Sequence, residues 1–78
     1  MKAVTLEYRI ENSLGVSIEH RCGKDAGYDL KFAGEAYDVT SIPIFARIWG
    51  NQGTFIVPVE SIVSLSFQEN IDECPVCS

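Results

Sequence analysis

Apolar and polar residues alternate along much of this chain, with the period of two that a β-strand imposes on its two faces. In the first run, residues 4–11, apolar side chains fall on one face and mostly charged side chains on the other. A second alternating run, residues 16–22, follows a turn signal at residues 12–15. Two such runs about a short turn predict a β-hairpin.

The stretch from residue 44 to residue 67 predicts a second hairpin that continues into one more strand. Residues 44–49 are apolar on both faces apart from Arg47, which indicates a central position in a sheet. A turn at residues 50–53 leads into the next strand. The pattern then predicts a single 3₁₀ turn at residues 59–62 and a last strand at residues 63–67.

The whole pattern predicts a mostly-β fold. A third strand is expected at residues 28–32, and residues 37–42 are expected as a loop or short edge strand because Pro43 lacks a backbone donor. We expect about five or six antiparallel strands in a small SH3-like or Sm-like barrel, closed or half-closed. The alternative is an antiparallel sheet that dimerises edge to edge. Residues 1–67 would form the single domain, and residues 68–78 a polar, acidic tail.

Size and charge narrow the function. A chain of 78 residues buries a marginal core, so a metal, a disulfide or a partner subunit often adds stability. The net charge is −5, from 11 acidic against 6 scattered basic residues, which argues against direct nucleic-acid binding. An acidic surface suits solubility or a basic protein partner. Early charges and short apolar runs predict neither a signal peptide nor a membrane span, so we expect a cytoplasmic protein.

Residues 53–67, which read GTFIVPVESIVSLSF, resemble the end of a small Sm-like or SH3-like barrel. In such barrels a strand, a 3₁₀ turn and a short final strand close the sheet. The chain is similar in this respect to the acidic Rof family, inhibitors of the transcription termination factor Rho. Rof proteins begin with a helix, whereas this chain opens on a strand, and no functional residue is transferred. The resemblance implies a small acidic barrel that binds a larger, basic, nucleic-acid-handling protein.

Four residues form a candidate metal site. Cys74 and Cys77 stand in a Cys-Pro-Val-Cys motif, in which Pro75 preorganises a tight turn and two thiolates can grip one zinc ion. His20 and Cys22, two positions apart, project from the same strand face. One histidine and three cysteines make a good tetrahedral set for zinc, and the bound ion would tie the tail to the first hairpin.

Two other interpretations of the same residues stay open. His20 and Cys22 continue the apolar face of Val16 and Ile18, so they can be an ordinary core thiol and a locally hydrogen-bonded histidine. Cys74 and its motif partner can also be a redox pair, although no helix follows to lower a thiol pKa. The odd number of cysteines, three, is a poor disulfide framework, and reduced thiols are expected in the cytosol.

Catalytic groups are scarce, because the chain has a single histidine and no nucleophile motif. We therefore expect a non-enzymatic, acidic protein-binding module that modulates a larger protein, of the kind carried by phages and other mobile elements. Trp49, Tyr28 and Tyr37 are the candidate partner-binding residues. The alternative is a zinc-stabilised structural or oligomeric β-domain. An enzyme of this size would need to build its cleft by oligomerisation.

Overall fold

A computed structural model describes residues 1–32 and 43–74 of the chain. The fold is mostly β, as predicted, and the described residues contain six strands and one short 3₁₀ helix. Among these residues no helix is long and apolar enough to cross a lipid bilayer. The elements are β1 (Lys2–Arg9), β2 (Val16–Gly23), β3 (Gly27–Phe32), β4 (Pro43–Gly50), β5 (Gly53–Pro58), η1 (Val59–Ser61) and β6 (Ile62–Gln68).

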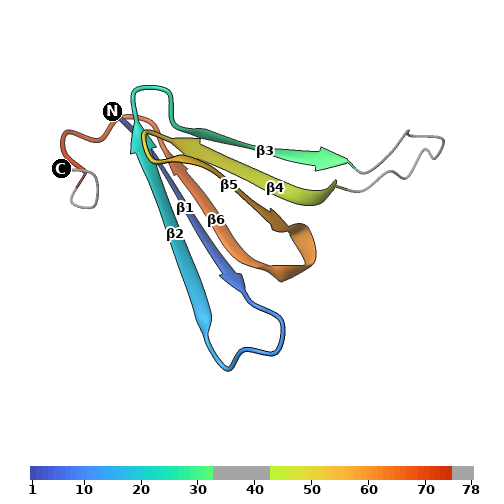
Figure 1. The fold of residues 1–78 in the computed structure, drawn as a ribbon. Helices are drawn as coiled ribbons and strands as arrows, with labels where there is room; N and C mark the ends of the chain where they lie inside the picture. The colour runs from blue at the N-terminus through green and yellow to red at the C-terminus, as the bar shows by residue number, and fades with distance from the viewer. Residues whose placement is uncertain (33–42, 75–78) are drawn as a thin grey trace.

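The strands form two antiparallel three-stranded sheets, in the orders β2-β1-β6 and β3-β4-β5. The sheets lie together at the end that carries both termini and splay apart toward the opposite end (Figure 1). No hydrogen-bonded ladder joins the two sheets within the described part of the chain, so these strands do not close into the expected barrel. The sequence correctly placed residues 44–49 in a central strand, because β4 lies between β3 and β5.

The main core lies between the two sheets. Its buried residues come from the two central strands and from β5, and Phe55, Ile62 and Leu65 pack against them. The alternation predicted for β1 is confirmed, since its even-numbered side chains from Val4 to Tyr8 point into this core. The buried residues of this cluster are Val4, Leu6, Tyr8, Ala46, Ile48 and Val57.

The faces of β2 differ from the apolar pattern. Glu19 and Arg21 stand opposite Leu6 and Val4, so the core side of β2 is polar. Ile18 lies on the outer face and is 61% exposed. The face that carries His20 therefore lies away from the main core. As the core-thiol interpretation expects, however, Cys22 is buried in a second cluster with Ala3 and Cys74, and His20 is hydrogen-bonded to Thr5.

The turn at residues 50–53 lies against the end of β2. The backbone N–H of Asn51 donates to the carbonyl oxygen of Cys22 at 2.9 Å. A Cβ atom on Gly50 would lie 2.8 Å from that same oxygen, so only glycine allows this approach. The second hairpin thereby braces the part of β2 that carries the candidate site.

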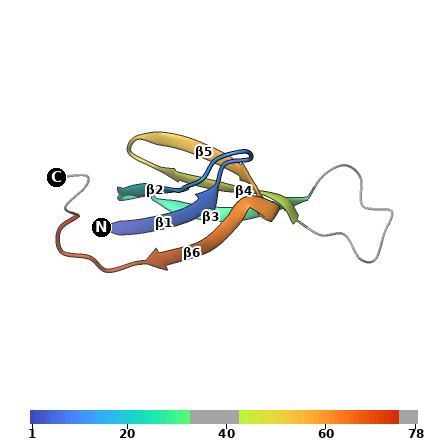
Figure 2. The same cartoon turned by 90° about the horizontal axis from the view of Figure 1, so that it is seen from below.

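The chain after β6 returns to the N-terminus, as the views in Figure 1 and Figure 2 both show. The backbone N–H of Ile71 donates to the carbonyl oxygen of Met1 at 3.1 Å. Ile71 also packs on a small second cluster of Ala3, Cys22 and Cys74. The tail therefore covers one end of the outer face of the first sheet.

Candidate metal site

The register of the first hairpin places the site on the outer face of the sheet. Thr5 stands opposite His20, and Ala3 stands opposite Cys22. Successive side chains alternate between faces, so these four residues share the face opposite Leu6 and the main core. His20 and Cys22 do project together, as the sequence predicts.

Two hydrogen bonds fix the ring of His20. Its Nδ1 atom lies 3.0 Å from the hydroxyl oxygen of Thr5, and its Nε2 atom lies 3.1 Å from the Sγ atom of Cys74. The ring therefore bridges the neighbouring strand and the tail. A ligating histidine is commonly oriented in this way, with its second nitrogen held by a neighbouring polar group.

The structure brings His20, Cys22 and Cys74 together in a group that can hold a metal ion. Their nitrogen and sulfur atoms all lie within 4.8 Å of one another. In a tetrahedral zinc site, bond lengths near 2.0–2.3 Å place neighbouring ligand atoms about 3.5–3.8 Å apart. Small side-chain movements would reach that spacing. Cys77, the fourth predicted ligand, lies outside the described residues.

The sulfur atoms of the site are in two chemical states. Cys22 is disulfide-bonded. Cys74 is a free thiol and is only 1% exposed. The expectation that all three cysteines are reduced is therefore wrong for Cys22. Its sulfur can coordinate a metal only after the disulfide is reduced.

A shallow hollow leads from solvent to this cluster. His20 and Cys74 line it, and Asp72 and Glu73 from the tail also contribute. Both acidic residues are exposed. Their negative charge favours the approach of a cation to the cluster. The remaining lining residues are Ala3, Gln68, Asn70 and Ile71.

The predicted partner-binding residues have different surroundings. Tyr28 is 42% exposed and meets the ring of Phe67 edge-on, at a centroid distance of 5.9 Å. Trp49 is half-buried and carries the guanidinium group of Arg47 above its ring at 5.3 Å. Tyr28 and Trp49 line one hollow together with Phe67. Tyr37 lies outside the described residues.

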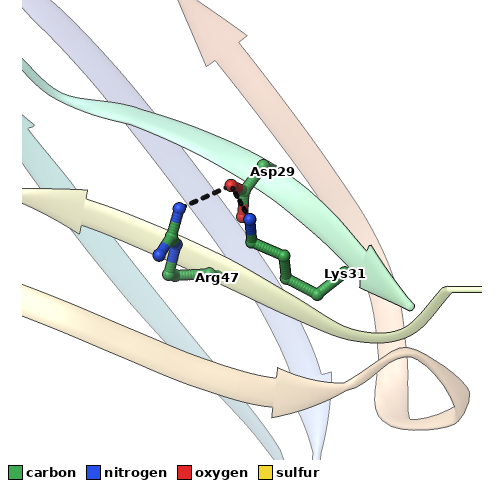
Figure 3. A network of polar contacts seen from close by, with 3 residues as sticks. All are labelled: Asp29, Lys31 and Arg47. Carbon is green, nitrogen blue, oxygen red and sulfur yellow. Dashed lines mark hydrogen bonds and ion pairs between the residues drawn. The ribbon is translucent and has the colours of Figure 1, made fainter. Parts of the chain in front are cut away.

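A charged network on the outer face of the second sheet was missed by the sequence reasoning. Asp29 on β3 accepts a hydrogen bond from Arg47 on β4 at 2.7 Å and pairs with Lys31 at 3.3 Å (Figure 3). Desolvation raises the pKa of Asp29, but the hydrogen bonds and charges of Arg47 and Lys31 outweigh it and lower that pKa below 3.8. The cross-strand register, which pairs Asp29 with Arg47, is the signal from which this network could have been predicted.

Thr5 was also missed as part of the site, although its position could have been derived. A hairpin about residues 12–15 that pairs residue 3 with residue 22 must pair Thr5 with His20.

Comparison with known proteins gives no match, because no family model, curated protein or solved structure is significantly similar to this chain.

Proposed function

We propose that the reduced chain is a zinc-stabilised β-domain in which the ion ties the C-terminal tail to the first hairpin. The convergence of His20, Cys22 and Cys74 carries this proposal. Histidine nitrogen and thiolate sulfur form the donor set that zinc prefers in structural sites. The fourth ligand in the proposal is Cys77, from the same motif as Cys74.

The surrounding residues support a structural role for the ion. With zinc on Nε2 of His20, the ring proton resides on Nδ1 and donates to the Thr5 hydroxyl, which fixes the ring toward the ion. Cys22 and Cys74 are buried, so their thiolates would be stabilised chiefly by the charge of the ion. Four protein ligands would leave no open position for a substrate, which favours a structural over a catalytic role.

Zinc titration of the reduced protein tests this proposal. We expect about one zinc ion per folded chain and a higher melting temperature than with a chelator. Free zinc 100-fold above Kd stabilises by about 2.7 kcal/mol, and each kcal/mol shifts the melting temperature of such a domain by about 4–8 °C. Cys74→Ser should remove most of the shift, whereas Ile18→Ser, on the same outer face, should keep it. Zinc well below one per chain in a folded, reduced sample contradicts the proposal.

A second function is supported by the open seam between β3 and β6. We define the open seam as Tyr28, Leu30 and Phe67, whose strand partners Ile48, Ala46 and Val4 are all in the core. All three side chains face inward yet are 38–45% exposed. Exposed apolar side chains beside unpaired strand edges are a common docking surface for another protein.

We propose that the open seam binds a protein partner and that the net charge of −5 selects a basic one. Affinity capture at low and high salt, followed by mass spectrometry, tests this. A true partner should be captured by the wild-type chain at low salt. Its capture should be weaker at high salt and should be lost with Leu30→Ser. Ile18→Ser, exposed on the opposite side of the first sheet, should retain it. Equal capture by both variants contradicts a role for the open seam.

A further inference from the structure

Two sulfur atoms in different oxidation states lie side by side in the metal site. Cys22 is in a disulfide, and the free thiol of Cys74 lies within 4.8 Å of it. Cys74 is held by His20 rather than cross-linked. This arrangement is a folded state of the cluster in which one of its three ligands has lost its capacity to bind a metal.

We propose that the site is a redox-controlled metal centre, which holds zinc when Cys22 is reduced and releases it when Cys22 forms its disulfide. This inference rests on the proposed zinc site and adds its regulation. The oxidant is a small-molecule disulfide, for which oxidised glutathione is the probe. Cys74 stays reduced throughout, as a thiolate while zinc is bound and as a free thiol after its release.

The oxidation step balances without any further reactant. The Cys22 thiolate attacks one sulfur of the small disulfide, and one small thiolate leaves. A second protein thiolate then attacks the Cys22 sulfur, which forms the protein disulfide and expels the second small thiolate. Two electrons pass from the two protein thiolates to the small disulfide, and the zinc ion leaves without a change of charge.

Loss of Cys22 is sufficient to release the ion. A disulfide sulfur is neutral and is a poor zinc ligand, and its cross-linked partner cannot be a thiolate ligand either. Of the ligands that the structure describes, His20 and Cys74 would remain, which is half of a tetrahedral set. Two ligands hold zinc much more weakly than four.

The fold does not depend on the ion in the oxidised state. The bond between His20 Nε2 and Cys74 Sγ, at 3.1 Å, links the same two elements that the metal would link. The backbone bond from Ile71 to Met1 holds the tail nearby. Release of zinc would therefore leave the tail in place, ready to bind the ion again after reduction.

The experiment starts from reduced, zinc-loaded protein and adds oxidised glutathione in the presence of a zinc-sensitive dye. We expect about one zinc ion released for every two thiols consumed, with circular dichroism showing retained β structure. Peptide mapping should place the disulfide on Cys22 and leave Cys74 alkylatable after unfolding. A thiol reductant should restore zinc binding. Ile18→Ser should respond like the wild-type chain.

The outcomes separate this inference from the zinc proposal itself. Failure of the reduced chain to bind zinc overturns the proposed function. Zinc binding that survives the loss of two thiols overturns the redox control alone. A disulfide on Cys74, or zinc-loaded thiols that resist the probe altogether, likewise contradicts the assigned role of Cys22.

Discussion

The hydroxyl group of Thr5 decides which nitrogen of His20 faces the cluster. It lies 3.0 Å from Nδ1 and leaves Nε2 directed at Cys74. A ring without this partner can rotate, and each rotation moves Nε2 away from the sulfur atoms. In the proposed metal site, Thr5 would therefore act on the ion through the histidine, as a positioning residue.

Thr5→Val should lower zinc affinity by about 10- to 100-fold, the usual effect of removing a hydrogen bond behind a ligand. The valine side chain keeps the shape and the β propensity of threonine, so the fold should persist. Competition against a zinc chelator of known affinity measures the change in the reduced protein. Thr54→Val, at an exposed position on β5, is the matched control. Equal affinities for the two variants would remove Thr5 from the site.

The charge of the Asp29 carboxylate makes the stability of the folded domain depend on pH at low pH. Because Arg47 and Lys31 lower its pKa below 3.8, the folded state keeps the carboxylate charged where an unfolded chain begins to protonate it. The stability that this carboxylate contributes is complete above the ordinary pKa. It is lost as the pH falls from 3.8 through the lowered folded value.

Asp29→Asn should therefore destabilise the domain at neutral pH, and the difference from the wild-type chain should shrink below pH 3.8. Urea unfolding of both proteins at several pH values, with chelator and reductant present, gives this difference. Asp25→Asn, at an exposed position outside the network, is the control. A difference that stays constant down to the acid limit would contradict the linkage.

Among the elements, the turn between β4 and β5 positions one cysteine of the site. Gly50 packs on the backbone of Cys22, where an added Cβ atom would meet the carbonyl oxygen at 2.8 Å and the amide nitrogen at 2.9 Å. Neither backbone atom can move without shifting β2. The second sheet thus sets the position of Cys22, a proposed metal ligand that the first sheet carries.

Gly50→Ala should push β2 away and weaken both the fold and zinc binding in the reduced protein. The matched control is Gly15→Ala, because nothing lies within 4 Å of the Cβ that it adds. Thermal unfolding and zinc titration of both variants measure the two effects. A Gly50→Ala protein that binds zinc as tightly as the Gly15→Ala protein would show that the turn does not support the site.

The positions of the strands along the chain were largely predictable, because alternation and turn signals are local properties of the sequence. The strand at residues 44–49, the 3₁₀ helix η1 and the two hairpins follow from such signals. The inner face of β2 was not predictable in this way. Its outer face, with His20 and Cys22, is partly covered by a tail that comes 54 positions later in the chain, so the local pattern misidentified the core side.

Two truncations test this assignment of faces. Leu6→Ala, at a fully buried position, should destabilise the domain by about 2–5 kcal/mol. Ile18→Ala, at a position that is 61% exposed, should change stability by no more than about 0.5 kcal/mol. Denaturant unfolding of the reduced, metal-free proteins compares them. If Leu6→Ala fails to fold, Tyr8→Phe provides a milder core variant. A loss of stability from Ile18→Ala larger than that from Leu6→Ala would indicate instead that the apolar face of β2 faces the main core.

At the scale of the whole molecule, the two sheets are joined by side-chain packing and not by a continuous ladder. Whether six strands close into a barrel depends on contacts between residues distant in sequence, and alternation carries no information about them. The site was more predictable than the closure, since residue chemistry alone identified His20, Cys22 and Cys74. The oxidation of Cys22 was not predicted, because an odd number of cysteines is a poor disulfide framework and thiols were expected to stay reduced in the cytosol.

The pairing of β1 with β6 has a consequence for synthesis of the chain. Of the described strands, β1 is synthesised first and is the centre of its sheet, and its neighbour on one side, β6, is synthesised last. Until Ile62–Gln68 emerges, that edge of β1 is open to the solvent and to other chains. Cys74 emerges later still, so only a chain that extends past Cys74 can assemble the proposed metal site. Ion binding would then distinguish chains that extend past Cys74 from shorter ones.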